Sequence, residues 1–119
     1  MRAGLLALSA LLGVAAGCTA TPAWGIDHSD EQSWFLAATG LGDQLLIAGG
    51  QPGATTSQAG RGRLFLRSAS ADYRTLESPQ PGMLWWVHAP SSLGVAWLCG
   101  EGGGVLRYEP SGGGTLTPI

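Results

Sequence analysis

Short apolar runs separated by turn-forming residues dominate the chain from about residue 33 onward. They alternate with clusters of Gly, Pro, Ser and Thr, and they read SWFLAA, QLLIAG, RLFLR, LWWVHA, GVAWLCG and GVLRYE. Runs of this length are typical of β-strands rather than helices, which need longer periodic segments. No stretch beyond the N-terminal leader shows helical periodicity over two turns. The pattern therefore predicts an all-β domain.

An internal repeat divides this region into two related units. The segment SWFLAATGLGDQLLIAGG, from Ser33, aligns without a gap on LWWVHAPSSLGVAWLCGE, from Leu84. Trp34 then falls on Trp85, and the first copy carries an insertion of turn-type residues before its third apolar run. Further strands are expected near YRTLE and GTLTP. We therefore expect repeats at 33–83 and 84–119, each with four antiparallel strands.

The N-terminus has the layout of an export signal. Arg2 supplies a positive start, and the run from Ala3 to Ala16 contains no charged residue. This run is shorter than the roughly 20 residues of a transmembrane helix, but it fits the apolar core of a secretory signal. Small residues then lead up to Cys18. The pattern predicts a signal helix over residues 1–17.

The sequence Ala15-Ala16-Gly17-Cys18 resembles the lipobox of bacterial lipoproteins. The resemblance implies that the Cys18 thiol is acylated, that the leader is cut immediately before it, and that residues 18–32 form a polar tether. The absence of Asp at Thr19 implies export to the outer membrane, with membrane lipid as a partner through Cys18. A plain secretory signal with an incidental Cys18, and an uncleaved anchor or misassigned start, remain the alternatives.

Charge and cysteine content narrow the possible functions. The 119 residues include no lysine, six arginines and eight acidic residues, for a net charge of −2. Nucleic-acid binding is not expected, because it needs several groups that neutralise phosphates. If Cys18 is acylated, Cys99 has no partner for a disulfide. We expect Cys99 to be a small buried side chain within a strand.

The second repeat resembles β-propellers with BNR or Asp-box repeats, including sialidase-like propellers and those related to the photosystem II assembly and stability factor. The residues that carry the resemblance are Trp85–Val87, Trp97–Gly100 and Gly103–Arg107. It implies that each repeat is one propeller-like blade. Ser70 and Asp72 match part of the Asp-box hairpin, without its Gly and Trp, and the resemblance implies that they hold a turn. Near Ser111 the second copy loses the Asp.

Two blades are fewer than the four to eight that close a propeller. The expected fold is all-β, with two four-stranded antiparallel propeller-like blades, a partial or truncated β-propeller, after an N-terminal signal helix. The chain could be a fragment of a larger propeller, could assemble with other copies, or could form a small sandwich or open barrel.

No catalytic, cofactor or metal site is assigned from the sequence. The cluster Asp27–Glu31 carries oxygen and imidazole ligands, but its spacing matches no calcium or zinc motif, and we expect a solvated tether. The segment Gly100–Gly104 lacks the lysine of a phosphate-binding loop and precedes a strand, so it reads as a hairpin turn. Enzymatic activity is not expected.

The segment LWWVHA supplies the candidate binding residues. Strand alternation places Trp86 and His88 on one face, and Trp85 and Val87 on the other. His88 is expected to be a partly buried strand residue. Although Ser91 and Ser92 are nearby, no nucleophile-elbow motif surrounds them.

The tryptophans have two possible roles. We expect them to pack between blades, whereas an exposed pair could stack on a sugar or a peptide. The tryptophans of the repeats are Trp34, Trp85, Trp86 and Trp97. The sequence favours an outer-membrane lipoprotein that acts as an interaction scaffold for an unknown protein or glycan. The alternatives are a fragment or remnant of a secreted sialidase-like enzyme and a tryptophan-bearing carbohydrate-binding module.

Overall fold

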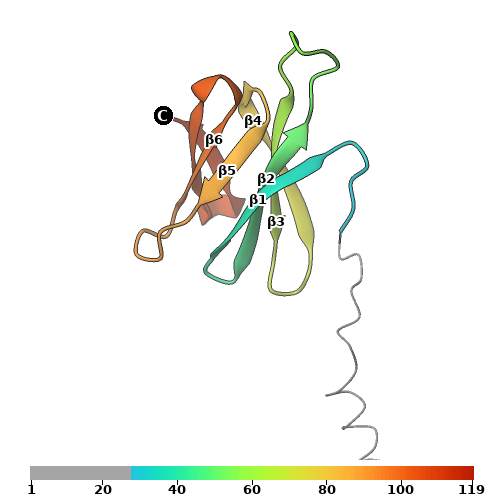
Figure 1. The fold of residues 1–119 in the computed structure, drawn as a ribbon. Coiled ribbons are helices and arrows are strands. Elements are labelled where there is room, and N and C mark those ends of the chain that lie inside the picture. The colour runs from blue at the N-terminus through green and yellow to red at the C-terminus, as the bar shows by residue number, and fades with distance from the viewer. Residues whose placement is uncertain (1–27) are drawn as a thin grey trace, which may run out of the picture.

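The computed structural model describes residues 28–119, which form two four-stranded antiparallel sheets (Figure 1). The predicted signal helix and Cys18 lie outside the described residues. The first sheet contains β1 (Trp34–Leu41), β2 (Gln44–Gln51), β3 (Arg61–Arg67) and β4 (Tyr73–Pro81). The second contains β5 (Leu84–His88), β6 (Ala96–Gly100), β7 (Val105–Glu109) and β8 (Thr115–Pro118).

Consecutive strands are neighbours throughout both sheets, in the orders β1-β2-β3-β4 and β5-β6-β7-β8. The predicted all-β class, the two units of four strands and the fourth strand of each unit are confirmed. The insertion of the first repeat lies in the loop between β2 and β3, and the matching glycines of the second repeat form a short 3₁₀ turn, Glu101–Gly103. Among residues 28–119, no helix is long and apolar enough to span a membrane.

The two sheets pack face to face around one apolar core. Strand alternation places every second residue of β2, β3, β6 and β7 in this layer. β5 lies next to β1 and β2, and the β1–β2 and β5–β6 turns lie at the same end of the molecule (Figure 1). The buried core residues are Leu46, Ala48, Leu64, Leu66, Leu84, Val87, Ala96, Leu98, Leu106 and Tyr108.

The two sheets meet through opposite faces of the repeated unit. In the first sheet, Ile47 pairs with Phe65. The repeat alignment equates this pair with Leu98 and Leu106, which also pair with each other. Leu98 and Leu106 point into the core, whereas Ile47 and Phe65 alternate with core residues and point to the outer side of the first sheet. The arrangement is therefore head-to-tail and lacks the two-fold symmetry of a sandwich with matching faces.

The register also corrects the alignment of the first strand in each repeat. Leu36 is the extra residue of a bulge in β1, and Trp85 is the extra residue of a bulge in β5. Trp85 therefore corresponds to Leu36, and the predicted match with Trp34 is wrong by two residues. The shift arises because the β5–β6 hairpin is two residues longer than the β1–β2 hairpin.

Three expectations about burial are wrong. Trp34 and Trp85 are 59% and 54% exposed, so neither is buried between the sheets. Cys99 is exposed because it alternates with the core residue Leu98 and points outward. His88 is exposed as well. The expected pairing of Trp86 with His88 on one face and Val87 on the other is confirmed, but the bulge also exposes Trp85.

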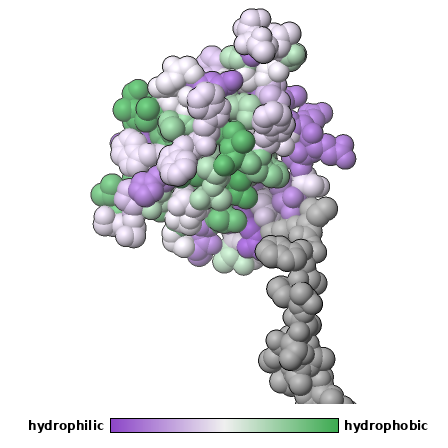
Figure 2. Space-filling model, in the orientation of Figure 1, coloured by the Kyte–Doolittle hydropathy of each residue, from purple (hydrophilic) through white to green (hydrophobic). Residues whose placement is uncertain are grey.

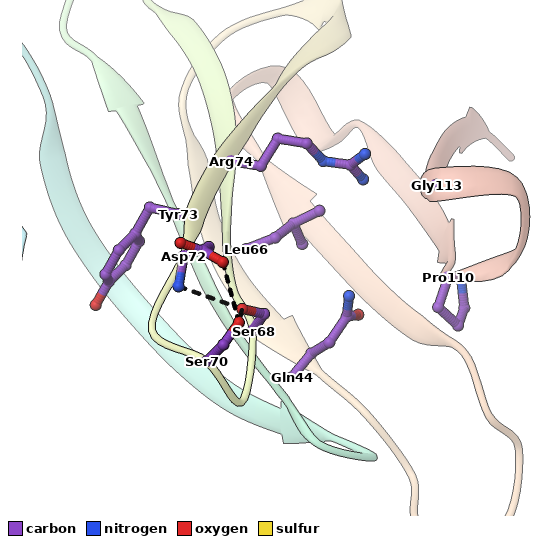
Figure 3. Close-up of a pocket in the computed structure, with 9 residues that line it drawn as sticks. All are labelled: Gln44, Leu66, Ser68, Ser70, Asp72, Tyr73, Arg74, Pro110 and Gly113. Atoms are coloured by element: carbon purple, nitrogen blue, oxygen red, sulfur yellow. Dashed lines mark hydrogen bonds between the residues drawn. The ribbon is translucent and has the colours of Figure 1, made fainter.

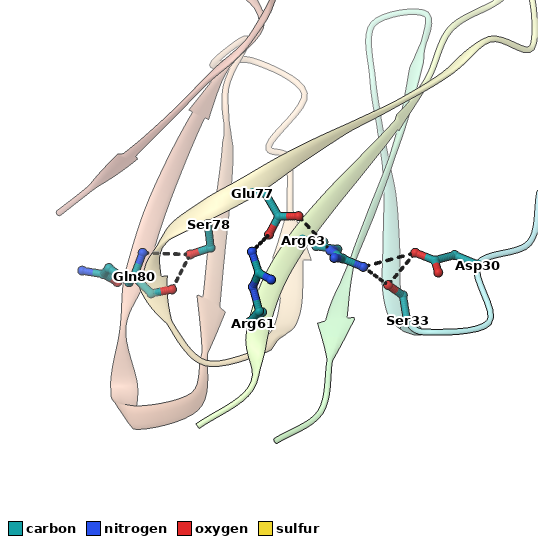
Figure 4. Close-up of polar contacts among 7 residues, drawn as sticks. All are labelled: Asp30, Ser33, Arg61, Arg63, Glu77, Ser78 and Gln80. Carbon is teal, nitrogen blue, oxygen red and sulfur yellow. Dashed lines mark hydrogen bonds and ion pairs between the residues drawn. The ribbon is translucent and has the colours of Figure 1, made fainter. Parts of the chain in front are cut away.

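Residues 28–33 lie against the outer side of the first sheet and are not a free tether. The His28 ring stacks on Tyr73 with ring centroids 4.2 Å apart. Arg63 Nη1 donates to Ser33 Oγ at 2.9 Å and lies 3.4 Å from Asp30 Oδ2 (Figure 4). Arg63 Nε also donates to Glu77 Oε1 at 2.9 Å. Residues 28–33 are thus held to the first sheet by side chains of β3 and β4.

Glu101 joins the second sheet to the connection between the sheets. Its Oε2 accepts hydrogen bonds from the backbone N–H groups of Met83, at 2.8 Å, and Gly60, at 3.0 Å. Gly82 adopts φ +102°, and a Cβ there would lie 2.7 Å from Glu101 Cβ. Gly82 therefore provides both the left-handed backbone and the close approach that this junction needs.

Candidate interaction surface

The outer side of the second sheet is an exposed surface rich in aromatic residues, here called the tryptophan face. Two rows of paired residues cross it, Trp86–Cys99–Val105 and His88–Trp97–Arg107. Trp86 is 59% exposed and Val105 is 40% exposed. The tryptophan face comprises Trp86, His88, Trp97, Cys99, Val105 and Arg107. Both candidate binding residues predicted from the sequence lie on it.

Arg107 gives the tryptophan face a polar group without a complete set of partners. Its Nη2 lies 3.1 Å from Glu109 Oε1. Its Nε is buried and has no hydrogen-bond partner in the structure. Buried donors are normally satisfied, and arginine and tryptophan are both enriched where proteins bind other proteins. The composition of this face is therefore typical of a surface that binds another protein.

A second apolar surface lies on the outer side of the first sheet, here called the β1–β2 patch. Figure 2 shows apolar side chains gathered over β1 and β2 in this region. Phe35 and Leu36 are each 43% exposed, and Leu45 is also exposed. The patch comprises Phe35, Leu36, Ala38, Leu45 and Ile47. Contiguous exposed apolar surface of this kind marks interaction sites in soluble domains.

The other half of this outer side is covered. Phe65 is only 1% exposed, because Phe35 contacts it edge-on, with ring centroids 4.9 Å apart, and the His28 ring lies 6.0 Å away. His28 also stacks on Tyr73 of β4. Residues 28–33 therefore shield β3, β4 and part of Phe35, whose ring lies 6.2 Å from that of His28, and leave Leu36, Ala38 and Leu45 exposed.

A cleft of about 510 Å³ opens beside the β3–β4 hairpin, between the edges of the two sheets (Figure 3). Arg74 points into this cleft, toward the β7–β8 turn, whereas Tyr73 points to the other side of β4 (Figure 3). Its lining contains no histidine, and thus no Ser–His pair for nucleophilic catalysis. The cleft is lined by Gln44, Leu66, Ser68, Ser70, Asp72, Tyr73, Arg74, Pro110 and Gly113.

Hydrogen bonds within the β3–β4 hairpin occupy its serine and aspartate side chains. Ser70 Oγ donates to Asp72 Oδ2 at 3.0 Å, and the Asp72 N–H donates to Ser68 Oγ at 3.2 Å. Ala71 sits between them at φ +64°, a conformation that non-glycine residues adopt only when their surroundings hold it. Ser70 and Asp72 therefore hold a turn, as the sequence predicted.

The described residues 28–119 contain no cluster of metal ligands. Within them, no three His, Cys, Asp or Glu side chains are grouped closely enough to hold a metal ion. Asp27, the first residue of the acidic cluster, lies outside the described residues. His28 and Asp30 instead contact Tyr73, Ser33 and Arg63.

Sequence reasoning missed the β1–β2 patch and the role of Glu101. The repeat alignment contained the signal for the patch, because Ile47 aligns with the core residue Leu98 and yet has no second sheet to cover it. No signal in the sequence indicated Glu101, since its partners are backbone groups distant along the chain. No protein-family model matches this chain, and no curated protein or solved structure was found to be similar to it.

Proposed function

We propose that this chain is an exported, membrane-anchored lipoprotein whose two-sheet domain is a propeller-like scaffold for binding another macromolecule. The observation that carries the proposal is the tryptophan face, where aromatic and aliphatic side chains lie open on the outer side of the second sheet. Burying such surface against a partner would be favourable by roughly 25 cal/mol for each Å² of apolar area removed from water.

The head-to-tail packing of the two sheets supports the propeller-like part of the proposal. Propeller blades are four-stranded antiparallel sheets arranged around an axis, so each blade covers one face of its neighbour with its own opposite face. The first and second sheets meet in this way. A closed sandwich related by a two-fold axis would instead join matching faces.

The membrane-anchored part rests on the leader and the sequence Ala15-Ala16-Gly17-Cys18. Acylation of Cys18 would attach the domain to a bilayer with about 0.8 kcal/mol per buried CH₂. The segment between Cys18 and His28 would then separate the folded sheets from the membrane surface. Anchoring would concentrate the tryptophan face near that surface, where its partner would be found.

Metabolic labelling with a fatty acid tests the anchor, and photo-crosslinking tests the surface. The parent chain should take up the label and sediment with the outer membrane, and Cys18→Ser should do neither. A photoreactive residue at position 86 should give a discrete adduct in cells, whereas one at Leu93, which is equally exposed in the β5–β6 loop, should not. Label retained by Cys18→Ser, or identical adducts from both positions, would contradict the proposal.

Glycan binding is a second candidate function, favoured by the two exposed aromatic residues Trp86 and His88 on one strand. A flat indole can stack on the apolar side of a sugar ring. Calorimetric titration with a panel of oligosaccharides would show saturable heat if this function holds. Trp86→Ala should abolish that heat while leaving the free energy of unfolding nearly unchanged.

A further inference from the structure

We propose that the partner of the tryptophan face is the β1–β2 patch of a second copy of this chain, and that copies join head-to-tail into a closed ring. This inference rests on the proposed scaffold function and names its partner. It follows from the contact that already exists between the two sheets within one chain.

Through the sequence repeat, each of the two outer faces corresponds to one of the two sheet faces that meet in that internal contact. By register, Trp86 and Cys99 correspond to Ala37 and Ala48, and Val105 corresponds to Leu64. These counterparts form the side of the first sheet that the second sheet covers. The tryptophan face is therefore the repeat of a surface that is already covered by a sheet inside the molecule.

The β1–β2 patch is the repeat of the covering side. Phe35 corresponds to Leu84, Ala38 to Val87, and Ile47 to Leu98. Leu84, Val87 and Leu98 are all at most 3% exposed, because they pack on the first sheet. Their counterparts in the first sheet lie on the outer side with no sheet upon them. A second copy that presents its tryptophan face would cover them in the same geometry.

The N-terminal segment leaves open the part of the patch that such a contact needs. Within one chain, β5 is the strand of the second sheet that packs against β1 and β2 of the first. Its counterpart in the repeat is β1, which carries Phe35, Leu36 and Ala38. His28 stacks on Tyr73 of β4 and lies 6.0 Å from Phe65 of β3 and 6.2 Å from Phe35, but it leaves Leu36 and Ala38 exposed. Residues 28–33 therefore leave a second copy room to pack on β1, the counterpart of the strand β5 that makes most of the contact between the sheets within one chain.

Head-to-tail contacts form either open filaments or closed rings, according to the rotation between successive units. Propellers of four to eight blades show that stacked four-stranded sheets can close. With two sheets in each chain, a closed ring would contain two to four copies. Membrane anchors at the N-termini would hold the copies at one surface and favour closure.

Native mass spectrometry of the full chain, purified from cells in mild detergent, tests the ring. The parent chain should give a complex of two to four copies. Trp86→Arg blocks only the tryptophan face, and Ala38→Arg blocks only the β1–β2 patch. Each variant alone should be a monomer. Mixed together, they should form a 1:1 heterodimer, because each brings the intact face that the other lacks.

Matched controls separate a blocked face from a misfolded chain. Leu93→Arg places the same charge at an exposed leucine in the β5–β6 loop and should assemble like the parent. Val105→Arg blocks the tryptophan face at a second position and should behave like Trp86→Arg. Circular dichroism of all four variants should match the parent, since positions 38, 86, 93 and 105 are exposed.

A parent chain that is monomeric at micromolar concentration would overturn the ring, as would sheets supplied by further blades of the same polypeptide. Variants that assemble like the parent, or folded variants that fail to form the mixed heterodimer, would overturn it too. These outcomes are distinct from those that test acylation. A ring formed by a chain without the acyl group would support the assembly and contradict the anchor. An acylated chain that is monomeric would support the anchor and contradict the assembly.

Discussion

Tyr108 and Gln44 connect the two sheets by a hydrogen bond across their interface. The Tyr108 hydroxyl, from β7, donates to Gln44 Oε1, at the start of β2, at 3.0 Å. Tyr108 is fully buried, and its ring lies in the core formed by both sheets. The bond satisfies the hydroxyl at the point where that ring leaves the apolar layer. It also fixes the relative position of two sheets that share no backbone ladder.

We expect Tyr108→Phe to lower the free energy of unfolding by about 1–2 kcal/mol, since it removes the bond and leaves the Gln44 amide oxygen without its donor. Urea denaturation measures this change. Gln44→Leu with Tyr108→Phe should cost less than the sum of the single variants, because the two groups interact with each other. Strictly additive costs would show that the hydrogen bond contributes nothing.

Alkaline pH should weaken the fold through the same residue. Burial raises the pKa of Tyr108 above its ordinary value of 10.0. The folded state therefore keeps its proton when the unfolded chain has lost it. The associated stability is complete below pH 10 and is lost as the pH rises through the raised pKa. Denaturation of the parent chain and of Tyr108→Phe between pH 8 and 11 should show the extra loss only in the parent.

Replacing Glu101 should loosen the junction between the sheets. Glu101→Ala leaves the N–H groups of Met83 and Gly60 without an acceptor in a buried region, and should cost at least about 2 kcal/mol. Glu101→Gln keeps an acceptor oxygen and should recover part of that loss. Glu109→Gln, which removes only a half-exposed ion pair with Arg107, should cost less than about 1 kcal/mol. Equal costs for Glu101→Ala and Glu109→Gln would contradict the bridging role.

Acid should release the N-terminal segment before the sheets unfold. Hydrogen bonds from Ser33 and from the Gln32 backbone, together with the charge of Arg63, lower the pKa of Asp30 below its ordinary value of 3.8. The docking free energy from this carboxylate is present above pH 3.8 and is lost as the pH falls through the lowered pKa. The protection of the Ser33 amide, which donates to the Asp30 carbonyl, should therefore fall in acid when its hydrogen exchange is compared with the intrinsic rate at each pH. Asp30→Asn should show fast exchange at neutral pH as well.

The sequence was sufficient to predict the strands and their grouping, because alternation and turn residues are local signals. It could not locate the bulges at Leu36 and Trp85, because they are defined only by how the first strand of each sheet pairs with the second. Strand alternation would have placed Cys99 on the opposite face from Leu98, but the continuous apolar run VAWLC suggested that both faces are buried. That run is apolar on both sides, but only one side faces a sheet within the chain. The docking of His28 and Asp30 was likewise hidden, because their partners lie on β3 and β4.

Tryptophan truncation separates the observed arrangement from one in which these residues support the core. Trp34 and Trp85 are each more than half exposed, so much of each indole remains in water in the folded state. Scaling the apolar transfer free energy by the buried fraction, we expect Trp34→Ala and Trp85→Ala each to cost about 1–2 kcal/mol.

Leu98→Ala provides the reference for these measurements. Leu98 has a smaller side chain but is 1% exposed at the centre of the core, and its truncation should cost about 2–5 kcal/mol because it leaves a cavity. Urea melts of the three variants should therefore place the leucine variant well below both tryptophan variants in stability. Tryptophan variants as unstable as Leu98→Ala would mean that the indoles are buried in solution. The melts should be run on the ring-blocked Ala38→Arg background, so that assembly does not contribute to the stability of any variant.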